Sequence, residues 1–487
     1  MKIKTTLILF IVFAVLLAFI FLSDIREKGK PAEADKLVDL STEDVTKIVL
    51  KTERGVIAFS KDEKGDWLIT EPLEAKADKY EVDRVADDFS SLSIERVVEE
   101  VAADLDKYGI PQEEVSLFLK GKEEPVKVII GMENPLDKKL FAKKADETRV
   151  VLIPSHIKSL LEKQVFDFRE KKIFQFKADE VKSIKLRSGA IHWEAKNEGE
   201  DWFLKKPVES LAEKSKITSL LSSLSDLEAI EFVSEAKKDE ETKEYALDTP
   251  EHEITLELPL ENQAVTFFIN KKENKVYATT SLSSKIIEVK DSLLETIQKE
   301  PTELRDKDVA SFYSWEAKKI RLEKGSLVVT AVKDKDNNWR FDKEDGEEAD
   351  KEKIDSLIRK IENLEAEEFI DPPLKLEDHG LDTPQTKITI SVKEDEDKTK
   401  DIIVLIGKTI KEIVKKKEEN KEAAPTDAKE EEVKANEEQV EEKEWVIVKN
   451  ARLDYLFKIK SEFLAEIPEN RDAWKKPPEE DQKEKEG

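Results

Sequence analysis

Apolar residues recur with the spacing of one helix face at three places along the chain. In each place they fall at i, i+3, i+7 and i+10, which puts four side chains on one stripe of an α-helix. The three stripes are Val82, Val85, Phe89 and Leu92, then Ile217, Leu220, Leu224 and Leu227, and finally Ile354, Leu357, Ile361 and Leu364. Asp78 and Asp350 precede two of them as predicted N-caps, whereas the second copy has the poorer capping residue Glu213. We therefore expect three amphipathic helices, each packed against an apolar surface.

Alternating apolar and polar residues predict strands around each of these helices. The clearest runs are "EVSLFL" from Glu114, "EITLEL" from Glu253 and "KITISV" from Lys387. Period-two alternation is typical of an antiparallel sheet with one buried and one solvated face. A further strand in each copy is expected to end at Gly131, Asn270 or Gly407, residues that tolerate positive φ and suit a turn.

A tryptophan phrase sets the period of the repeat. It reads "DWLITEP", "DWFLKKP" and "NWRFDKE", and its tryptophans Trp67, Trp202 and Trp339 lie 135 and 137 residues apart. Self-similarity at a fixed interval is the mark of a repeat protein. We expect each tryptophan to pack its helix onto its sheet, because a large aromatic side chain buries much apolar area. The alternative is that these side chains stack on a ligand such as a sugar.

The repeats predict an α+β fold: an N-terminal transmembrane helix, then three tandem modules. Each module is a mostly antiparallel sheet with one main helix and a short closing helix. A basic phrase is expected to close each module: "FREKK" from Phe168, "LRDKD" from Leu304 and "NRDAWKK" from Asn470. The predicted boundaries are 24–36 for a linker, 37–173, 174–310 and 311–469 for the modules, and 470–487 for a disordered tail. Stacked modules would form an elongated arm.

The third module carries a charged insertion. Residues 411–443 are nearly free of large apolar residues after Val414. Such a composition cannot support a core, so we expect a solvated, low-complexity insertion at a β-hairpin tip. The phrase "EWVIV" from Glu444 then resumes the sheet.

The N-terminal segment predicts a membrane anchor. Residues 7–22, "LILFIVFAVLLAFIFL", are apolar without a break, and Thr5, Thr6 and Ser23 extend the run to residues 5–23. This length suits one crossing of a bilayer core of about 30 Å. The nearest small-x-small cleavage motif, Ala32-Glu33-Ala34, lies too far downstream, so an uncleaved helix is favoured over a cleaved signal. We expect a single-pass protein of the inner (cytoplasmic) membrane with its body outside the cytoplasm.

Charge and cysteine content exclude several functions. The net charge is −27, with 111 acidic against 84 basic residues. Nucleic acid needs a basic surface, so no nucleic-acid partner is expected. The chain has no cysteine, which excludes disulfides, thiolate catalysis and iron–sulfur clusters.

The repeated phrases resemble a family of bacterial membrane-anchored proteins known as domain of unknown function 4340. The shared motifs are the W-x-x-x-x-P step at Trp67–Pro72 and Trp202–Pro207, a Y-G-L-x-x-P-like turn, and the closing R-[DE]-K at Arg169–Lys171 and Arg305–Lys307. The third copy departs from them, with Glu344 in place of the proline and Ala473 after Arg471-Asp472. The resemblance implies an extracytoplasmic accessory role beside ABC-type transport systems of the gliding-motility kind. It supplies no catalytic residues.

Motifs for known chemistry are incomplete in this sequence. "GKT" at Gly407–Thr409 lacks the earlier glycine of a phosphate-binding loop, since residue 402 is isoleucine. "DKDNN" at Asp334–Asn338 resembles the start of a calcium loop but continues with Trp339 where glycine is needed. The four histidines, His156, His192, His252 and His379, have no zinc-type spacing. We therefore nominate no catalytic, cofactor-binding or metal-binding residue and no cofactor.

Three functions remain open from the sequence. The first is a non-catalytic binding or scaffold protein whose partners are the membrane, through its N-terminal helix, and transporter subunits or other envelope proteins. The second is a carbohydrate-active or other hydrolase with a carboxylate site between modules. The third is a spacer whose repeat surfaces do not matter. The absence of a catalytic motif favours the first.

Overall fold

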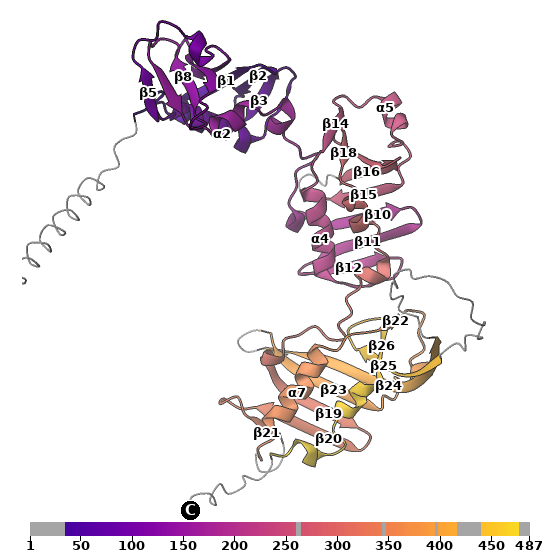
Figure 1. The fold of residues 1–487 in the computed structure, drawn as a ribbon. Helices are drawn as coiled ribbons and strands as arrows, with labels where there is room; N and C mark the ends of the chain where they lie inside the picture. The colour runs from indigo at the N-terminus through magenta and orange to yellow at the C-terminus, as the bar shows by residue number, and fades with distance from the viewer. Residues whose placement is uncertain (1–34, 260–263, 343–346, 395–397, 416–439, 477–487) are drawn as a thin grey trace, which may run out of the picture. The chain divides into compact units, whose positions relative to one another are not determined.

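Three antiparallel sheets, each with its own helix, make up the described part of the chain (Figure 1). The computed structural model describes residues 35–259, 264–342, 347–394, 398–415 and 440–476. It divides into two compact units, Met1–Lys172 with Glu228–Glu231, and Ile173–Leu227 with Phe232–Gly487. The first sheet belongs to the first unit and the other two to the second. The prediction of an α+β fold with three repeated sheet units is confirmed.

The elements repeat in the same order in each module. The first module contains β1 (Val45–Thr52), β2 (Gly55–Lys61), β3 (Trp67–Glu71), β4 (Ala75–Lys76), α2 (Lys79–Ser90), β5 (Arg96–Glu99), β6 (Glu113–Leu119), β7 (Val126–Glu133), β8 (Leu140–Lys144), β9 (Val150–Ile153) and α3 (Ile157–Leu161). The second contains β10 (Ser183–Ser188), β11 (Ile191–Glu198), β12 (Asp201–Lys206), β13 (Ser210–Ala212), α4 (Lys214–Ser225), β14 (Glu231–Ser234), α5 (Asp239–Glu244), β15 (His252–Glu257), β16 (Ala264–Lys272), β17 (Lys275–Thr280), β18 (Ile286–Val289) and α6 (Ser292–Ile297). The third contains β19 (Ala317–Lys324), β20 (Leu327–Lys333), β21 (Trp339–Phe341), α7 (Lys351–Glu362), β22 (Glu368–Ile370), β23 (Thr386–Lys393), β24 (Thr399–Lys415), β25 (Val440–Asn450) and β26 (Leu456–Lys460).

The strand order shows why each main helix must cross its sheet. In the first module the order is β4-β3-β2-β1-β6-β7-β8-β9-β5. The chain runs outward from the centre through β1 to β4, and the next strand, β5, lies at the opposite edge. It then returns to the centre, where β6 pairs with β1, and moves outward again to meet β5. Helix α2 makes the crossing, and α4 and α7 do the same in the other modules.

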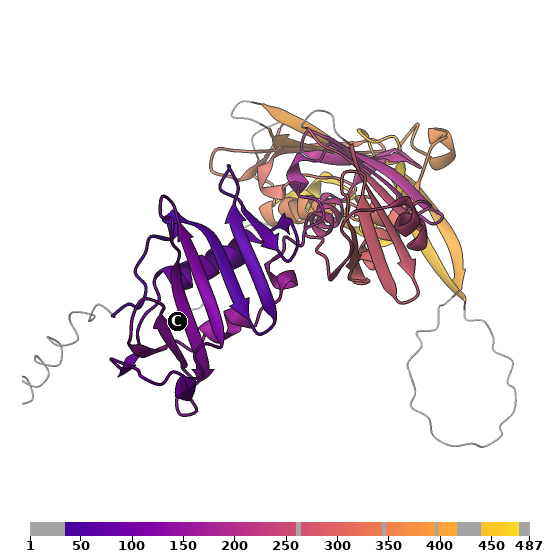
Figure 2. The ribbon, with the colours of Figure 1, turned by 90° about the horizontal axis from the view of Figure 1, so that it is seen from above.

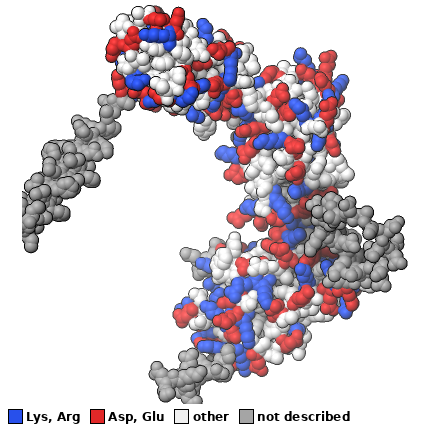
Figure 3. Space-filling model, viewed as in Figure 1, with Lys and Arg blue, Asp and Glu red and all other residues white. Residues whose placement is uncertain are grey.

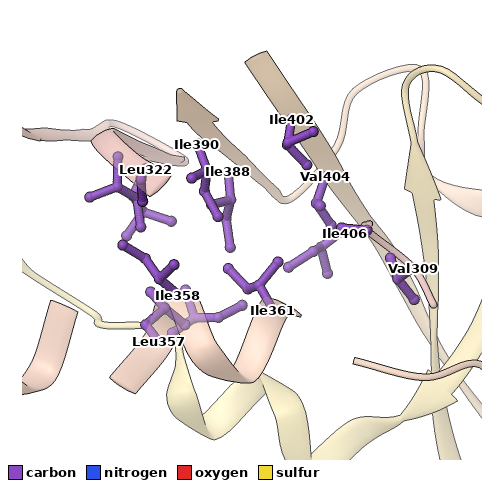
Figure 4. Close-up of a cluster of buried hydrophobic side chains, with 14 of the residues drawn as sticks. Val309, Leu322, Leu357, Ile358, Ile361, Ile388, Ile390, Ile402, Val404 and Ile406 are labelled. Atoms are coloured by element: carbon purple, nitrogen blue, oxygen red, sulfur yellow. The ribbon is translucent and has the colours of Figure 1, made fainter. Parts of the chain in front are cut away.

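Each main helix buries its apolar stripe against one face of its sheet. In the third module Leu357, Ile358 and Ile361 of α7 point toward Ile388 of β23 and Val404 of β24, and all are buried (Figure 4). Burial of a side chain of this size stabilises a protein by about 1.5–3 kcal/mol.

The predicted helix starts are confirmed in detail. The Asp78 carboxylate accepts hydrogen bonds from the N–H groups of Tyr80 and Glu81, and Asp350 accepts one from Lys353. Glu213 forms no side-chain cap, as its poorer propensity predicts. The helices end earlier than the stripes indicate, since α2 stops at Ser90, although Leu92 beyond it is still buried.

The sheets have one buried and one wetter face, as the alternating pattern predicts. Along β15 the buried and half-buried residues alternate without interruption. At β9 the pattern changes, because all four residues are buried. There the segment after β5 covers the second face, with Tyr108 and Ile110 packing beside Val150.

The prediction that Gly131, Asn270 and Gly407 end strands in a positive-φ turn is wrong. Strand β7 continues through Gly131 to Glu133, its register shifts between Ile130 and Glu133, and neither glycine has a positive φ. The glycine is required by close approach, because a Cβ at Gly131 would lie 2.2 Å from the Tyr108 carbonyl oxygen. At Gly407 the corresponding distance, to the carbonyl oxygen of His379, is 2.3 Å.

The second module has a polar side chain in place of these glycines. Asn270 occupies the equivalent place in β16, and its Nδ2 donates a hydrogen bond to the Tyr245 carbonyl oxygen at 3.2 Å. In the second module an amide side chain therefore bonds to this carbonyl. In the other two modules the equivalent carbonyl packs directly against the backbone of the glycine.

The module ends also differ from prediction in the third copy. The backbone N–H groups of Asp78, Glu213 and Asp350 donate to the carbonyl oxygens of Phe168, Leu304 and Trp474, which ties each helix start to its module end. Bridges Ala77–Arg169, Ala212–Arg305 and Ala349–Lys475 follow directly. Lys475, and not Arg471, is therefore the counterpart of Arg169 and Arg305. The short closing helix of the third module is a 3-10 helix, Ser461–Glu466.

The insertion of the third module begins later and ends earlier than predicted. Strands β24 and β25 stay paired from Val404–Asn450 out to Lys415–Val440, so 411–415 and 440–443 belong to the sheet. The hairpin that they form extends beyond the neighbouring strands (Figure 2). Residues 416–439 lie outside the described residues.

The predicted membrane anchor also lies outside the described residues, since these begin at residue 35. Within the part of the chain that the structure describes, no helix has the length and apolar character needed to cross a bilayer.

We predict that Gly131→Ala destabilises the first module by about 2 kcal/mol, because the new methyl group has no space beside the Tyr108 carbonyl. The matched change in the second module, Asn270→Ala, removes one hydrogen bond without a clash and should cost about 1 kcal/mol. Hydrogen exchange of the full-length protein, followed by mass spectrometry at β6–β7 and β15–β16, measures both. Equal protection in Gly131→Ala and the unmodified protein would contradict the steric explanation.

Candidate functional site

The three repeat tryptophans lie in the module cores. Their exposed fractions are 2% for Trp67, 3% for Trp202 and 0% for Trp339. Each starts or nearly starts a strand, at β3, β12 or β21, next to the main helix of its module. Their predicted packing role is confirmed, and none has a ring face open to a sugar or another ligand.

Two of these tryptophans bind a carboxylate on the main helix. Trp67 Nε1 donates to Asp83 Oδ1 at 2.7 Å, and Trp339 Nε1 donates to Asp355 Oδ1 at 2.8 Å. Burial by itself would raise the pKa of Asp83, but hydrogen bonds from Lys79 and Trp67 outweigh it and lower that pKa below its ordinary value. The sheet and the helix are thereby joined by a polar contact as well as by packing.

The second module replaces this polar contact. Lys61 and Lys333 lie over the rings of the first and third tryptophans, with the ammonium 4.8 and 5.0 Å from the ring centroid. In the second module Asn197 pairs with Trp202 where the other two have lysine, and Thr218 stands at the aspartate position. The second module thus has neutral residues in place of both the lysine and the aspartate.

The calcium-like phrase forms a hairpin turn. Asp334 Oδ1 accepts the backbone N–H groups of Asp336 and Asn338, both at 2.9 Å. Its other oxygen, Oδ2, accepts from Arg340 Nε at 2.9 Å. Asp62 accepts two backbone N–H groups in the same way in the first module. The turn itself uses the carboxylate, so the phrase has a structural role.

The histidines lie apart, and among the described residues no group of three or more metal-ligating side chains comes together. His252 is buried, where desolvation lowers its pKa, and its Nδ1 lies 2.7 Å from Ser188 Oγ. His156 is exposed, with Nε2 3.5 Å from Asp88 Oδ1.

A groove runs between the main helix and the closing segment of the second module. This helix groove has a volume of about 560 Å³ and is lined by hydroxyl and charged side chains, among them Ser219 and Ser223 of α4 and Lys299 and Glu303 beyond α6. The third module has a counterpart of about 410 Å³, where Ser356 of α7 takes the place of Ser219. The sequence did not indicate these residues, because the groove depends on how the two segments pack.

A buried arginine occupies the junction between the second and third sheets, which we define as Arg305–Asp308. The guanidinium of Arg305 lies over the ring of Phe369, 3.8 Å from its centroid, and over Tyr455 at 4.6 Å. It also pairs with Asp371, with Nη1 2.8 Å from Oδ1. Burial raises the pKa of Tyr455 to about 12. The arginine thus fixes the segment that leaves the second module to the β22–β26 edge of the third sheet.

Two aspartates follow this arginine, and both hold protons more tightly than usual. Burial is the main cause that raises the pKa of Asp306, and nearby Glu213 adds to it. Burial also raises the pKa of Asp308 to about 6, with further contributions from Asp306 and Glu365. Carboxyl groups with raised pKa are typical of functional sites as well as of structural clusters. The sequence marked this place only as the basic phrase "LRDKD".

Comparison with known families agrees with the repeat structure. The family model described as "Domain of unknown function (DUF4340)" matches residues 67–243 and 202–384. The first region begins at Trp67, the first residue of β3, and the second at Trp202, the second residue of β12. Together they cover more than half of the chain. The chain belongs to the DUF4340 family. The membership agrees with the tryptophan and turn motifs, and it carries no assigned activity.

No curated protein matches the chain. Three solved chains match, among them the DNA polymerase III subunit beta from Pseudomonas aeruginosa, with 9% sequence identity, a TM-score of 0.14, and coverage of 87% of this chain and 95% of that chain. A TM-score this low does not establish a shared fold.

We predict that Asp308→Asn stabilises the protein at pH 7.5 but not at pH 4. Because folding raises the pKa of Asp308 to about 6, from an ordinary 3.8, its contribution to stability is present below about pH 4 and is lost as pH rises through about 6. The neutral amide avoids this loss, and we expect a gain on the order of 1 kcal/mol after allowance for solvent screening.

Guanidinium unfolding of the full-length protein at the two pH values provides the measurement. Asp291→Asn, on an exposed aspartate before α6, serves as the matched control and should change stability equally at both. An Asp308→Asn effect independent of pH would show that folding does not raise the pKa of the Asp308 carboxyl.

Proposed function

We propose that this DUF4340 protein is a non-catalytic, membrane-anchored binding or scaffold protein that assists an envelope or ABC-type transport complex from outside the cytoplasm. The apolar segment 5–23 supports the anchor. The observation that carries the binding role is the repetition of one packed sheet-and-helix module whose interior is apolar, so that ligands must meet its surface. The predicted end-to-end stacking of the modules stays a prediction.

The helix groove is the surface that we expect a partner protein to occupy. It recurs in the second and third modules, whereas the charged side chains around it differ between them. On the face of the molecule that Figure 3 shows, acidic and basic side chains are interspersed. A polar groove of this kind suits a reversible contact with another protein more than an obligate interface, whose core is more apolar.

Site-specific cross-linking tests this role. A photo-reactive amino acid at Ser219, in the groove, should cross-link the full-length protein in native membranes to a transporter subunit or another envelope protein. The same label at Lys185, an exposed position of β10, is the matched control and should give fewer adducts. If mass spectrometry finds no membrane partner at either position, the accessory role is wrong.

A hydrolase with a carboxylate site between modules is the second candidate function. The raised pKa values of Asp306 and Asp308 at the junction favour it, because a general acid needs a carboxyl group that stays protonated near neutral pH. If this candidate is correct, Asp308→Asn should reduce hydrolysis of a polysaccharide panel at least a hundredfold while the protein stays folded. Lack of hydrolysis by the unmodified protein would remove it.

A further inference from the structure

Two aromatic side chains at the start of the third module are exposed and stacked on each other. The exposed fractions are 57% for Tyr313 and 67% for Trp315. Their ring centroids lie 4.3 Å apart, with an angle of 16° between the ring planes. The pair flanks and enters the 3-10 turn Ser314–Glu316, which Glu362 Oε1 holds by accepting the N–H of Ser314 at 3.1 Å. A flat apolar surface of this size in water indicates a contact site.

The aromatic pair borders a hollow of about 380 Å³, which we name the aromatic hollow. Its walls carry Trp315, the amide of Asn337, the carboxylate of Asp355 and three cations: Lys333, Lys351 and Arg359. Basic side chains gather on the face of the third module where α7 lies (Figure 3). Asp355 is fixed there by the hydrogen bond from Trp339 Nε1.

The three cations have no carboxylate partner among the described residues, because no carboxylate oxygen lies within 4.0 Å of them. Elsewhere on this acidic protein, lysines are commonly paired. In the first module the equivalent lysine, Lys79, forms an ion pair with Asp83 at 2.5 Å. Burial, with the nearby positive charges of Lys318 and Lys351, lowers the pKa of Lys333. The aromatic hollow thus holds positive charge that an anion would neutralise.

The repeats show that this hollow is a property of the third module. The four positions that differ are Tyr313, Trp315, Asn337 and Arg359, where the first module has Ser41, Glu43, Gly65 and Asp87. At the first, second and fourth of these the second module has Lys177, Asp179 and Ser222. Lysine at the position of Lys351 is common to all three, as Lys79 and Lys214. The shared fold therefore does not require the aromatic pair or the arginine.

We propose that the aromatic hollow binds a carboxylate-bearing sugar unit of an acidic glycan. The apolar face of a sugar ring stacks on an aromatic side chain, and its hydroxyl groups bond to Asn337 and Asp355. Its carboxylate pairs with Arg359 and the two lysines. This assignment uses the aromatic, amide, carboxylate and cationic groups of the hollow, and it is independent of the accessory role proposed above.

Other anionic ligands would use only part of the hollow. A free phosphate or an acidic peptide has no sugar ring to stack on the indole face and no set of ring hydroxyl groups to bond to Asn337 and Asp355. A single-stranded nucleic acid needs a basic groove that follows several phosphates, whereas these cations are confined to one hollow of a chain with net charge −27.

Titration calorimetry of the purified full-length protein tests the proposal. The probes are trigalacturonic acid, the neutral cellotriose, inorganic phosphate and a hexaglutamate peptide. We expect trigalacturonic acid to bind most tightly, with an affinity that falls as salt is added. Trp315→Ala and Arg359→Ala should each weaken its binding about tenfold. Both side chains are exposed, so thermal unfolding should stay unchanged.

Lys214→Ala, at the matched position of the second module, provides the control and should leave binding unchanged. Binding of cellotriose as tight as that of trigalacturonic acid would overturn the role of the cations. Tighter binding of phosphate or hexaglutamate would overturn the assignment to a sugar. If none of the probes binds, or if Lys214→Ala weakens binding as much as Trp315→Ala, the proposed site is wrong.

Discussion

The burial of one helix stripe against one sheet face is the constraint on which each module depends. The central strands β1 and β6 are neighbours in the sheet although α2 and β5 lie between them in sequence, so the helix has to cross the sheet to connect the two halves. Its apolar side chains then fill the space over that face. The Asp78 cap and the hydrogen bond from the Asp78 N–H to the Phe168 carbonyl fix where the helix starts. They thereby fix where the helix packs on the tryptophan beneath it.

The three copies act as controls for one another. Equivalent positions in the core stay apolar and similar in size, as Val82, Ile217 and Ile354 do, because each must fill a similar volume. Polar contacts are exchanged in pairs, as when Asn197 and Thr218 replace the lysine and aspartate beside the tryptophan. Surface positions change independently, and at the aromatic hollow several of these changes meet on the third module. Specialised binding is thus compatible with a constant interior.

Much of the fold could be predicted from the sequence because its patterns are local. The stripe of Ile354, Leu357 and Ile361 required only helical periodicity, and the Asp350 cap required only the residue before it. Contacts between distant segments were not accessible. Gly131 was assigned to a turn because glycine favours positive φ, whereas the Tyr108 carbonyl that excludes a side chain comes from another segment. Lys475 was missed for the same reason, since its role is defined by a bridge to Ala349.

The three modules, their antiparallel strands, the family and the absence of thiol chemistry can be read from the amino-acid sequence, because composition and periodicity are properties of the chain alone. Which polar groups meet depends on how distant segments pack. Asp306 and Asp308 lie in a phrase that reads as basic, yet burial and the approach of Glu213 and Glu365 raise their pKa values. Trp315 reads as one tryptophan among seven. Its exposure beside cations that have no carboxylate partner among the described residues follows from the fold, because burial and charge separation depend on segments that pack together across the module.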